Sequence, residues 1–154
     1  MKAFDRIMFP VDLSESSDRI VPRLKGIIKK FNAELHVVFV ARIFGHFAGM
    51  HVPHPAIKNF EAEIVEGSKK RLAEFIDVYF PDYPKVKSAV LSGDITDQML
   101  EYIDNNKIDL VMMGTHGRKG LEKVIFGSVA ERFMRMSPVP VLLINPYRYV
   151  KKTK

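Results

Sequence analysis

The residues of this chain best suited to chemistry are three glycines and a serine toward its C-terminal end. Gly114 and Gly117 are separated by two residues, and Gly127-Ser128 follows after nine more. An apolar run precedes this segment and a helix-like run follows it. Glycines let the backbone approach an anion closely, and the free N–H groups at the start of a helix hold negative charge. The spacing therefore predicts a phosphate-binding loop between a strand and a helix.

This spacing differs from that of the two common nucleotide loops. It is Gly-x2-Gly-x9-Gly-Ser, which is neither the Walker loop nor the dinucleotide-binding loop. Two glycines would suffice for a simple turn, so the long basic excursion 118–126 favours a binding role. Ser128 is expected to cap the following helix. Its hydroxyl, and the N–H groups of Ser128 and Val129, would then face the phosphate.

The basic residues of this excursion are open to two interpretations. Arg118, Lys119 and Lys123 lie where the charge of a triphosphate would collect. A solvated basic loop explains them equally well.

A single acidic residue, Asp12, closes the apolar run 7–11. Two roles are equally open to it. It is either a turn or cap residue for the next helix, or a carboxylate that accepts from an adenine amino group or approaches a phosphate-bound metal. The segment 12–17 has no glycine, which disfavours a flavodoxin-type phosphate loop. A response-regulator receiver would need a second acidic residue here and a lysine near the last strand, and the sequence has neither.

The histidines offer weaker candidates. His46, His51 and His54 lie in a segment rich in glycine and proline with no carboxylate among them, so we interpret them as exposed loop residues and expect no metal site. His116 lies between two glycines of the predicted phosphate loop. There the peptide matters more than the imidazole, and no residue spacing supports a catalytic base or a Ser-His-Asp arrangement.

The composition narrows the class of protein. The chain has 154 residues, no cysteine and a net charge of +6. We expect a single domain over 1–146 and a basic tail over 147–154. The lack of cysteine excludes disulfides and thiolate-bound zinc. No apolar run approaches the ~20 residues that span a bilayer, and the N-terminus lacks a secretory core, so a cytoplasmic protein is expected. The basic residues follow no nucleic-acid-binding pattern.

Strand-like and helix-like segments alternate along the chain. Apolar strands without polar alternation indicate a parallel sheet covered by helices on both faces. The pattern predicts a doubly wound α/β fold with five strands, whose ligand binds at the carboxyl ends where strand order reverses. Pro22 requires that the first helix either begin near Val21 or be kinked. The expected strands are 7–11, 34–40, 86–91, 110–113 and 139–144, and the expected helices are 14–30, 57–80, 95–105 and 128–136.

Several of these segments together resemble the universal stress protein family, in its ATP-binding subgroup. The resemblance covers nearly the whole chain. It rests on Met8-Phe-Pro-Val-Asp12-Leu-Ser, His36-Val-Val-Phe-Val40, Gly93, Asp109-Leu-Val-Met-Met-Gly-Thr-His-Gly117 with Gly127-Ser128, and Ser137-Pro-Val-Pro-Val-Leu-Leu-Ile144.

The resemblance implies a strand order of 3-2-1-4-5 and a site for ATP, with Mg²⁺ as the accompanying metal. Ala130 departs from relatives that carry a hydroxyl there, which removes one phosphate donor. The implied site has an adenine part, a ribose and phosphate part, and a helix start that holds the phosphates. The adenine part comprises Asp12, Val40, Pro10 and Val11. The ribose and phosphate part comprises Met113, Gly114, Thr115, His116 and Gly117. The helix start comprises Gly127, Ser128 and Val129.

Two functions of different classes follow. The first is an ATP-binding regulatory or signalling module in the stress response, read by an unidentified partner protein. The second is a slow ATPase or phosphotransfer enzyme on the same fold. The sequence favours the first, because it shows neither a P-loop lysine nor an assignable base.

The last predicted strand suggests self-association. It begins at Val139 and ends at Ile144, and it is too apolar to remain an exposed sheet edge. We expect a twofold homodimer through this strand, with the tail 146–149 lying across the partner and burying Tyr147 or Tyr149. The resemblance agrees with this arrangement. The alternative is a monomer whose own tail folds back over the edge.

Overall fold

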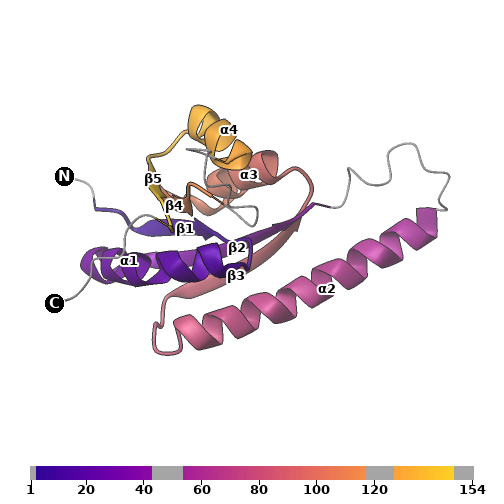
Figure 1. The fold of residues 1–154 in the computed structure, drawn as a ribbon, viewed down its shortest axis with the longest axis horizontal. Helices are drawn as coiled ribbons and strands as arrows, with labels where there is room; N and C mark the ends of the chain where they lie inside the picture. The colour runs from indigo at the N-terminus through magenta and orange to yellow at the C-terminus, as the bar shows by residue number, and fades with distance from the viewer. Residues whose placement is uncertain (1–2, 43–53, 117–126, 148–154) are drawn as a thin grey trace.

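A computed structural model of the chain describes residues 3–42, 54–116 and 127–147. Five strands in this part form one parallel sheet in the order β3-β2-β1-β4-β5, and four helices cover it (Figure 1). The predicted doubly wound α/β fold and its strand order are therefore confirmed. The elements in chain order are β1 (Arg6–Pro10), α1 (Glu15–Phe31), β2 (Glu34–Ala41), α2 (His54–Tyr79), β3 (Val86–Ser92), α3 (Ile95–Asn106), β4 (Leu110–Gly114), α4 (Ser128–Met136) and β5 (Val141–Ile144).

The sheet is buried on both faces, which explains its unbroken apolar strands. On β1, Ile7 and Phe9 pack into one core with α1 and α2, while Met8 between them packs into a second core with α3 and α4. All three side chains are 0% exposed. Successive strand residues point to opposite faces, so each face requires its own layer of helices. Figure 1 shows α1 and α2 on one face and α3 and α4 on the other.

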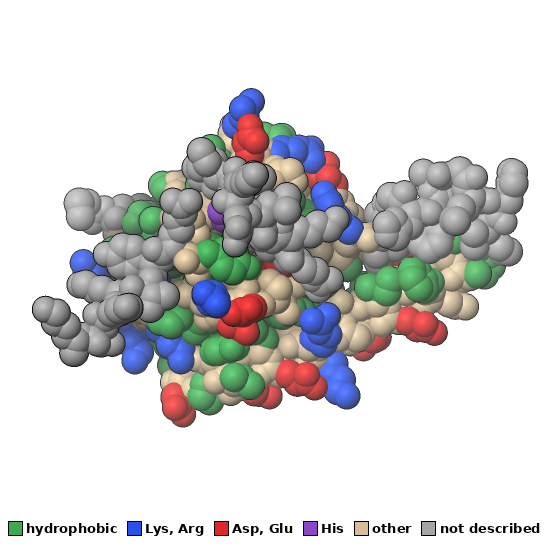
Figure 2. All heavy atoms as spheres, viewed as in Figure 1, with side chains coloured by type: hydrophobic (Ala, Val, Ile, Leu, Met, Phe, Trp, Pro, Cys, Tyr) green, Lys and Arg blue, Asp and Glu red, His purple; other side chains and the backbone are tan. Residues whose placement is uncertain are grey.

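The visible surface carries both signs of charge. Figure 2 shows acidic and basic side chains mixed along the lower part of the molecule, over α2. Among the described residues on this face there is no broad patch of a single sign.

Several predicted boundaries were wrong, for reasons that involve proline. β5 begins at Val141 and not at residue 139, because Pro140 has no N–H to give to a ladder. α2 begins at His54 and not at residue 57, so His54 lies in the helix and not in the expected loop. Pro55 in its first turn is tolerated because the N–H groups there have no partner within the helix. His46 and His51 lie outside the described residues.

α1 runs without interruption through Pro22, so a start near Val21 is wrong. The helix begins at Glu15, and the hydroxyl of Ser14 caps it by accepting from the N–H of Ser16. Pro22 is exposed. Its ring therefore faces water, which can hydrogen-bond to the carbonyl that a proline leaves unpaired.

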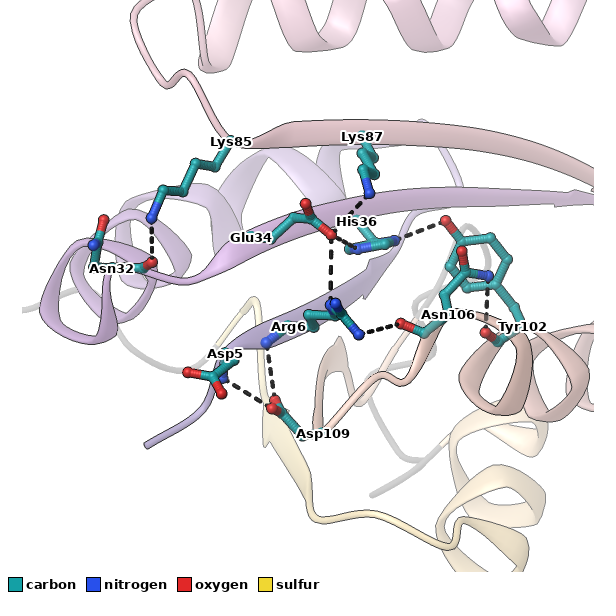
Figure 3. A network of polar contacts seen from close by, with 10 residues as sticks. All are labelled: Asp5, Arg6, Asn32, Glu34, His36, Lys85, Lys87, Tyr102, Asn106 and Asp109. Atoms are coloured by element: carbon teal, nitrogen blue, oxygen red, sulfur yellow. Dashed lines mark hydrogen bonds and ion pairs between the residues drawn. The ribbon is translucent and has the colours of Figure 1, made fainter. Parts of the chain in front are cut away.

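A buried histidine joins β2 to α3 near the amino ends of the strands (Figure 3). His36 is 1% exposed; its Nε2 lies 2.7 Å from Glu34 Oε1 and its Nδ1 lies 2.8 Å from the Tyr102 hydroxyl. A carboxylate only accepts, so Nε2 carries the proton and donates to Glu34, and Nδ1 accepts from Tyr102. Both ring nitrogens of neutral His36 are thereby satisfied.

Charged groups from the neighbouring strands converge on the same carboxylate. Lys87 of β3 and Arg6 of β1 lie 3.1 Å and 3.8 Å from Glu34 Oε1. The carboxylate of Asp109 accepts from the N–H groups of Asp5 and Arg6, which fastens the start of β4 to the start of β1.

Burial lowers the pKa of His36, and the opposing attraction of Glu34 does not overcome it.

We expect this histidine to make stability depend on pH. Its pKa is lower in the folded than in the unfolded chain, where it is about 6.5, so acid favours the unfolded state. The contribution of His36 is therefore complete above about pH 6.5 and is lost as the pH falls below it. Urea unfolding between pH 7 and pH 5 should show a falling free energy of unfolding.

The variant His36→Gln should flatten that slope, whatever it does to stability at neutral pH. Tyr102→Phe is the matched control, because it removes a hydrogen bond but keeps the titrating ring, and its slope should equal that of the wild type. An unchanged slope in His36→Gln would contradict the assignment.

Candidate functional site

β1 and β4 stop pairing before their carboxyl ends, and we call this part of the sheet edge the opening. These neighbours pair through Ile7–Leu110 and Met8–Val111. Both strands continue, to Pro10 and Gly114, beyond the last of these pairs. The chain leaves β1 toward α1 on one face, and it returns from β4 to α4 on the other. This is the point at which strand order reverses, where open α/β sheets bind ligands.

Asp12 orders the turn that leaves β1. Its Oδ1 accepts from the backbone N–H of Ser14 at 3.0 Å and from the hydroxyls of Ser14 and Ser17 at 2.6 and 2.9 Å. The turn role that the sequence left open is therefore present, although the helix cap itself is Ser14. Leu13 has φ 59°, a left-handed conformation that is uncommon outside glycine and frequent at functional sites.

The opposite wall begins at the end of β4, where a side chain would be crowded. A Cβ on Gly114 would lie 2.9 Å from Ile20 Cδ1 and 3.1 Å from the His116 carbonyl oxygen. A side chain at this position would therefore require Ile20 or the His116 backbone to shift. The next residue, Thr115, donates its N–H to Ile144 of β5 at 2.9 Å, and its hydroxyl lies 2.8 Å from His116 Nδ1.

The two ends of the predicted phosphate loop are fastened together. The N–H of Gly127 donates to the carbonyl of Thr115 at 2.6 Å, so the chain returns to the end of β4 before α4 begins. Residues 117–126 of the loop lie outside the described residues, and they include Gly117 and the basic residues Arg118, Lys119 and Lys123. Gly127 caps α4 with its backbone alone, and no side chain caps this helix.

The prediction that Ser128 caps α4 is therefore wrong; Ser128 is the first residue of the helix. Because the cap is a glycine, no side-chain oxygen occupies the N–H groups of the first turn. Those of Ser128 and Val129 also lack a partner within the helix. With the positive end of the helix dipole, they can hold an anion.

The position of α4 is fixed by an arginine. Arg132 contacts both carboxylate oxygens of Asp94 at 2.9 and 3.0 Å and reaches Asp97 at 3.1 Å. Asp94 also caps α3 by accepting from the N–H of Asp97, as the sequence predicted. Helix α4 is thereby attached to the start of α3.

The apolar members of the predicted site are largely buried. Val11, Val40 and Met113 are at most 8% exposed, and Pro10 and Val129 are half-buried. The structure thus brings the ends of β1, β2 and β4 together with the start of α4. It describes every predicted site residue except Gly117.

One group of residues at this edge was not predicted as part of the site. Ser16, Arg19 and Tyr147 meet beside His116, and Tyr147 lies 131 residues from Ser16 in the sequence. No spacing signal could have found this contact. Tyr147, which we had assigned to the tail, thus contacts its own chain.

Neither a metal-binding cluster nor a membrane-spanning helix is present among residues 3–42, 54–116 and 127–147. No three histidine or acidic side chains of these residues are grouped as metal ligands. None of the helices there is both long and apolar enough to cross a bilayer.

Comparison with known proteins relates the chain to one family. The model of the Universal stress protein family matches residues 3–145. Universal stress protein MJ0531 of Methanocaldococcus jannaschii is 31% identical over 151 residues, which covers 92% of this chain and 82% of the relative. MJ0577 of the same organism is 27% identical over 159 residues, covering 92% and 95%.

Solved structures share the fold. The structure of MJ0577 aligns with a TM-score of 0.81 at 21% identity, over 94% of this chain and 97% of that one. A universal stress protein in complex with cAMP aligns at 0.59 and 23% identity, covering 94% and 99%. One from Archaeoglobus fulgidus in complex with dAMP aligns at 0.64 and 16% identity, covering 94% and 100%.

The tight approach at Gly114 gives a test of this wall. Gly114→Ala should lower the free energy of unfolding by about 1–3 kcal/mol, because the methyl group must displace Ile20 or the His116 backbone. Ile20→Val removes the closest atom, so the double variant should lose less than the sum of the single losses. Urea unfolding measures all three.

The control is Gly26→Ala, on the exposed face of α1, where a Cβ would meet nothing within 4 Å. It should leave stability unchanged or improve it, since alanine favours a helix more than glycine does. If Gly114→Ala were as stable as the wild type, Ile20 and the His116 backbone would have to move aside at no cost in free energy, which would contradict the prediction.

Proposed function

The chain belongs to the universal stress protein family, and from that membership we propose that it is an ATP-binding regulatory protein. In this proposal the nucleotide lies across the carboxyl ends of β1 and β4. The observation that carries it is the start of α4. There a glycine cap leaves the first N–H groups open to phosphate, beside Thr115 at the end of β4.

Adenine would lie on the other side of the same opening. We propose that the Asp12 carboxylate accepts from the adenine amino group, with Val40, Pro10 and Val11 forming the apolar surroundings. Guanine presents a carbonyl oxygen at the corresponding position, which a carboxylate would repel. ATP should therefore bind more tightly than GTP. Support comes from the family members solved with cAMP and dAMP, both adenine nucleotides.

A bound Mg²⁺ fits this arrangement in a limited way. Mg²⁺ keeps several waters and takes one or two carboxylates together with phosphate oxygens. Because Asp12 is assigned to adenine, at the other end of the nucleotide, we propose that phosphate oxygens and water hold the ion. The nucleotide would serve as a signal read by a partner protein, with hydrolysis slow if it occurs.

Calorimetry with ATP and GTP tests the nucleotide assignment. We expect ATP binding in the wild type, weaker GTP binding, and loss of both in Gly127→Val, whose side chain would enter the phosphate space and meet the Thr115 carbonyl. Even a Cβ at residue 127 would lie 3.3 Å from the Thr115 carbonyl oxygen. Gly26→Val is the matched control and should bind as the wild type does. Undiminished ATP affinity in a folded Gly127→Val protein would reject the phosphate site.

We further propose a homodimer through the free edge of β5. Leu142, Met134 and Met136 are exposed apolar side chains on β5 and α4. The carbonyls of Pro140 and Ile144 accept from β4. Alternate residues point to alternate edges, so the N–H groups of Val141 and Leu143 face outward.

Proline substitutions distinguish the two edges. Val141→Pro and Leu143→Pro remove outward N–H groups, so they should shift the protein from dimer to monomer in sedimentation equilibrium while leaving it folded. Leu142→Pro removes an N–H that faces β4 and should instead destabilise the sheet. A wild-type monomer at tens of micromolar would refute the dimer, and a dimer that survives both outward substitutions would place the interface elsewhere.

A further inference from the structure

Residues 145–147, which follow β5, turn back over the carboxyl edge of the sheet. Pro146 is buried, and the Asn145 side chain accepts from the N–H of Tyr147 at 2.9 Å. This turn places Tyr147 between α1 and the end of β4.

Tyr147 contacts both walls of the opening. Its hydroxyl lies 2.7 Å from the hydroxyl of Ser16, in the first turn of α1. The guanidinium of Arg19, one helical turn further on, lies 5.4 Å from the centre of its ring. The ring also meets His116 edge to face, with 6.1 Å between the ring centres.

Burial alone does not account for this position, since Tyr147 is 44% exposed. Its placement depends on directional contacts: a hydroxyl hydrogen bond, a cation above the ring and an edge-to-face ring pair. Two of these contacts, those with Ser16 and His116, lead to groups already placed at the site.

On the α1 side, Ser16 belongs to the turn whose Ser14 and Ser17 bind Asp12. On the β4 side, His116 contacts Thr115, and the carbonyl of Thr115 receives the N–H of Gly127. Tyr147 therefore lies between the adenine side and the phosphate side of the opening, and it is connected to each through one intervening residue.

We propose that Tyr147 is a positioning residue of the nucleotide site, holding the turn after β1 and the end of β4, at Thr115 and His116, at the separation that an adenine nucleotide requires. This inference rests on the proposed function. It assigns a role in binding to residues 145–147. The ring of Tyr147 acts through His116, and its hydroxyl acts through Ser16.

Four variants test the contacts by ATP calorimetry. Tyr147→Phe keeps the ring and should weaken ATP binding about two- to tenfold, the range for one net hydrogen bond. Ser16→Ala should weaken it by a similar factor. The double variant should be no weaker than either single one, because both remove the same bond. Tyr147→Ala loses the ring contacts as well and should weaken binding more than tenfold.

Tyrosine fluorescence supplies a readout that a purely structural role would not change. The chain has no tryptophan, so its emission comes from tyrosine. ATP should change the emission of the wild type, and Tyr147→Phe should abolish that change. Tyr102→Phe is the matched control, because it removes a hydroxyl from the His36 network and should leave both ATP affinity and the fluorescence response intact.

The outcomes separate the two proposals. If the wild type binds ATP and folded Tyr147 variants bind it equally well, the positioning role is wrong and the nucleotide assignment stands. If Tyr102→Phe weakens binding as much as Tyr147→Phe does, the effect is one of general stability and the role is again wrong. If the wild type binds no adenine nucleotide, both proposals fail.

Discussion

The rest of the structure depends on the burial of the central strand. Ile7, Met8 and Phe9 of β1 are fully buried although they point alternately to opposite faces. One layer of helices could not shield them all from water, so the chain must supply a layer to each face. It does so by adding β2 and β3 on one side of β1 and β4 and β5 on the other. This reversal creates the opening at the carboxyl ends.

The two ends of the sheet differ in whether their polar groups already have partners. At the amino ends, Asp109 and Glu34 are occupied by backbone N–H groups, a histidine and basic side chains from neighbouring strands. At the carboxyl ends, the first N–H groups of α4 are left open by its glycine cap. A polar group that already holds a partner contributes to stability, whereas one left open at a helix start can serve a ligand.

Sequence reasoning recovered what local pattern determines. Unbroken apolar strands gave the parallel sheet, and α4 was predicted with the bounds that it has, Ser128–Met136. The capping residue of that helix was predicted wrongly. Serine is a better side-chain cap than glycine, but the residue at the cap position is Gly127, which acts through its backbone alone. The start of β5 was misplaced at residue 139, because the apolar character of the run does not reveal that Pro140 lacks an N–H. The contact of Tyr147 with Ser16 was beyond reach, because it depends on how the ends of the fold meet.

The close approach of Ile20 to Gly114 also constrains how such a chain can change over generations. The two positions belong to different elements, yet the terminal methyl group of one occupies the volume that a side chain at the other would fill. A lineage that shortens residue 20 first passes through a slightly underpacked protein and can then accept alanine at 114. The reverse order passes through a crowded one. Descendants should therefore retain the pair or exchange both members, with the helix residue changing before the glycine.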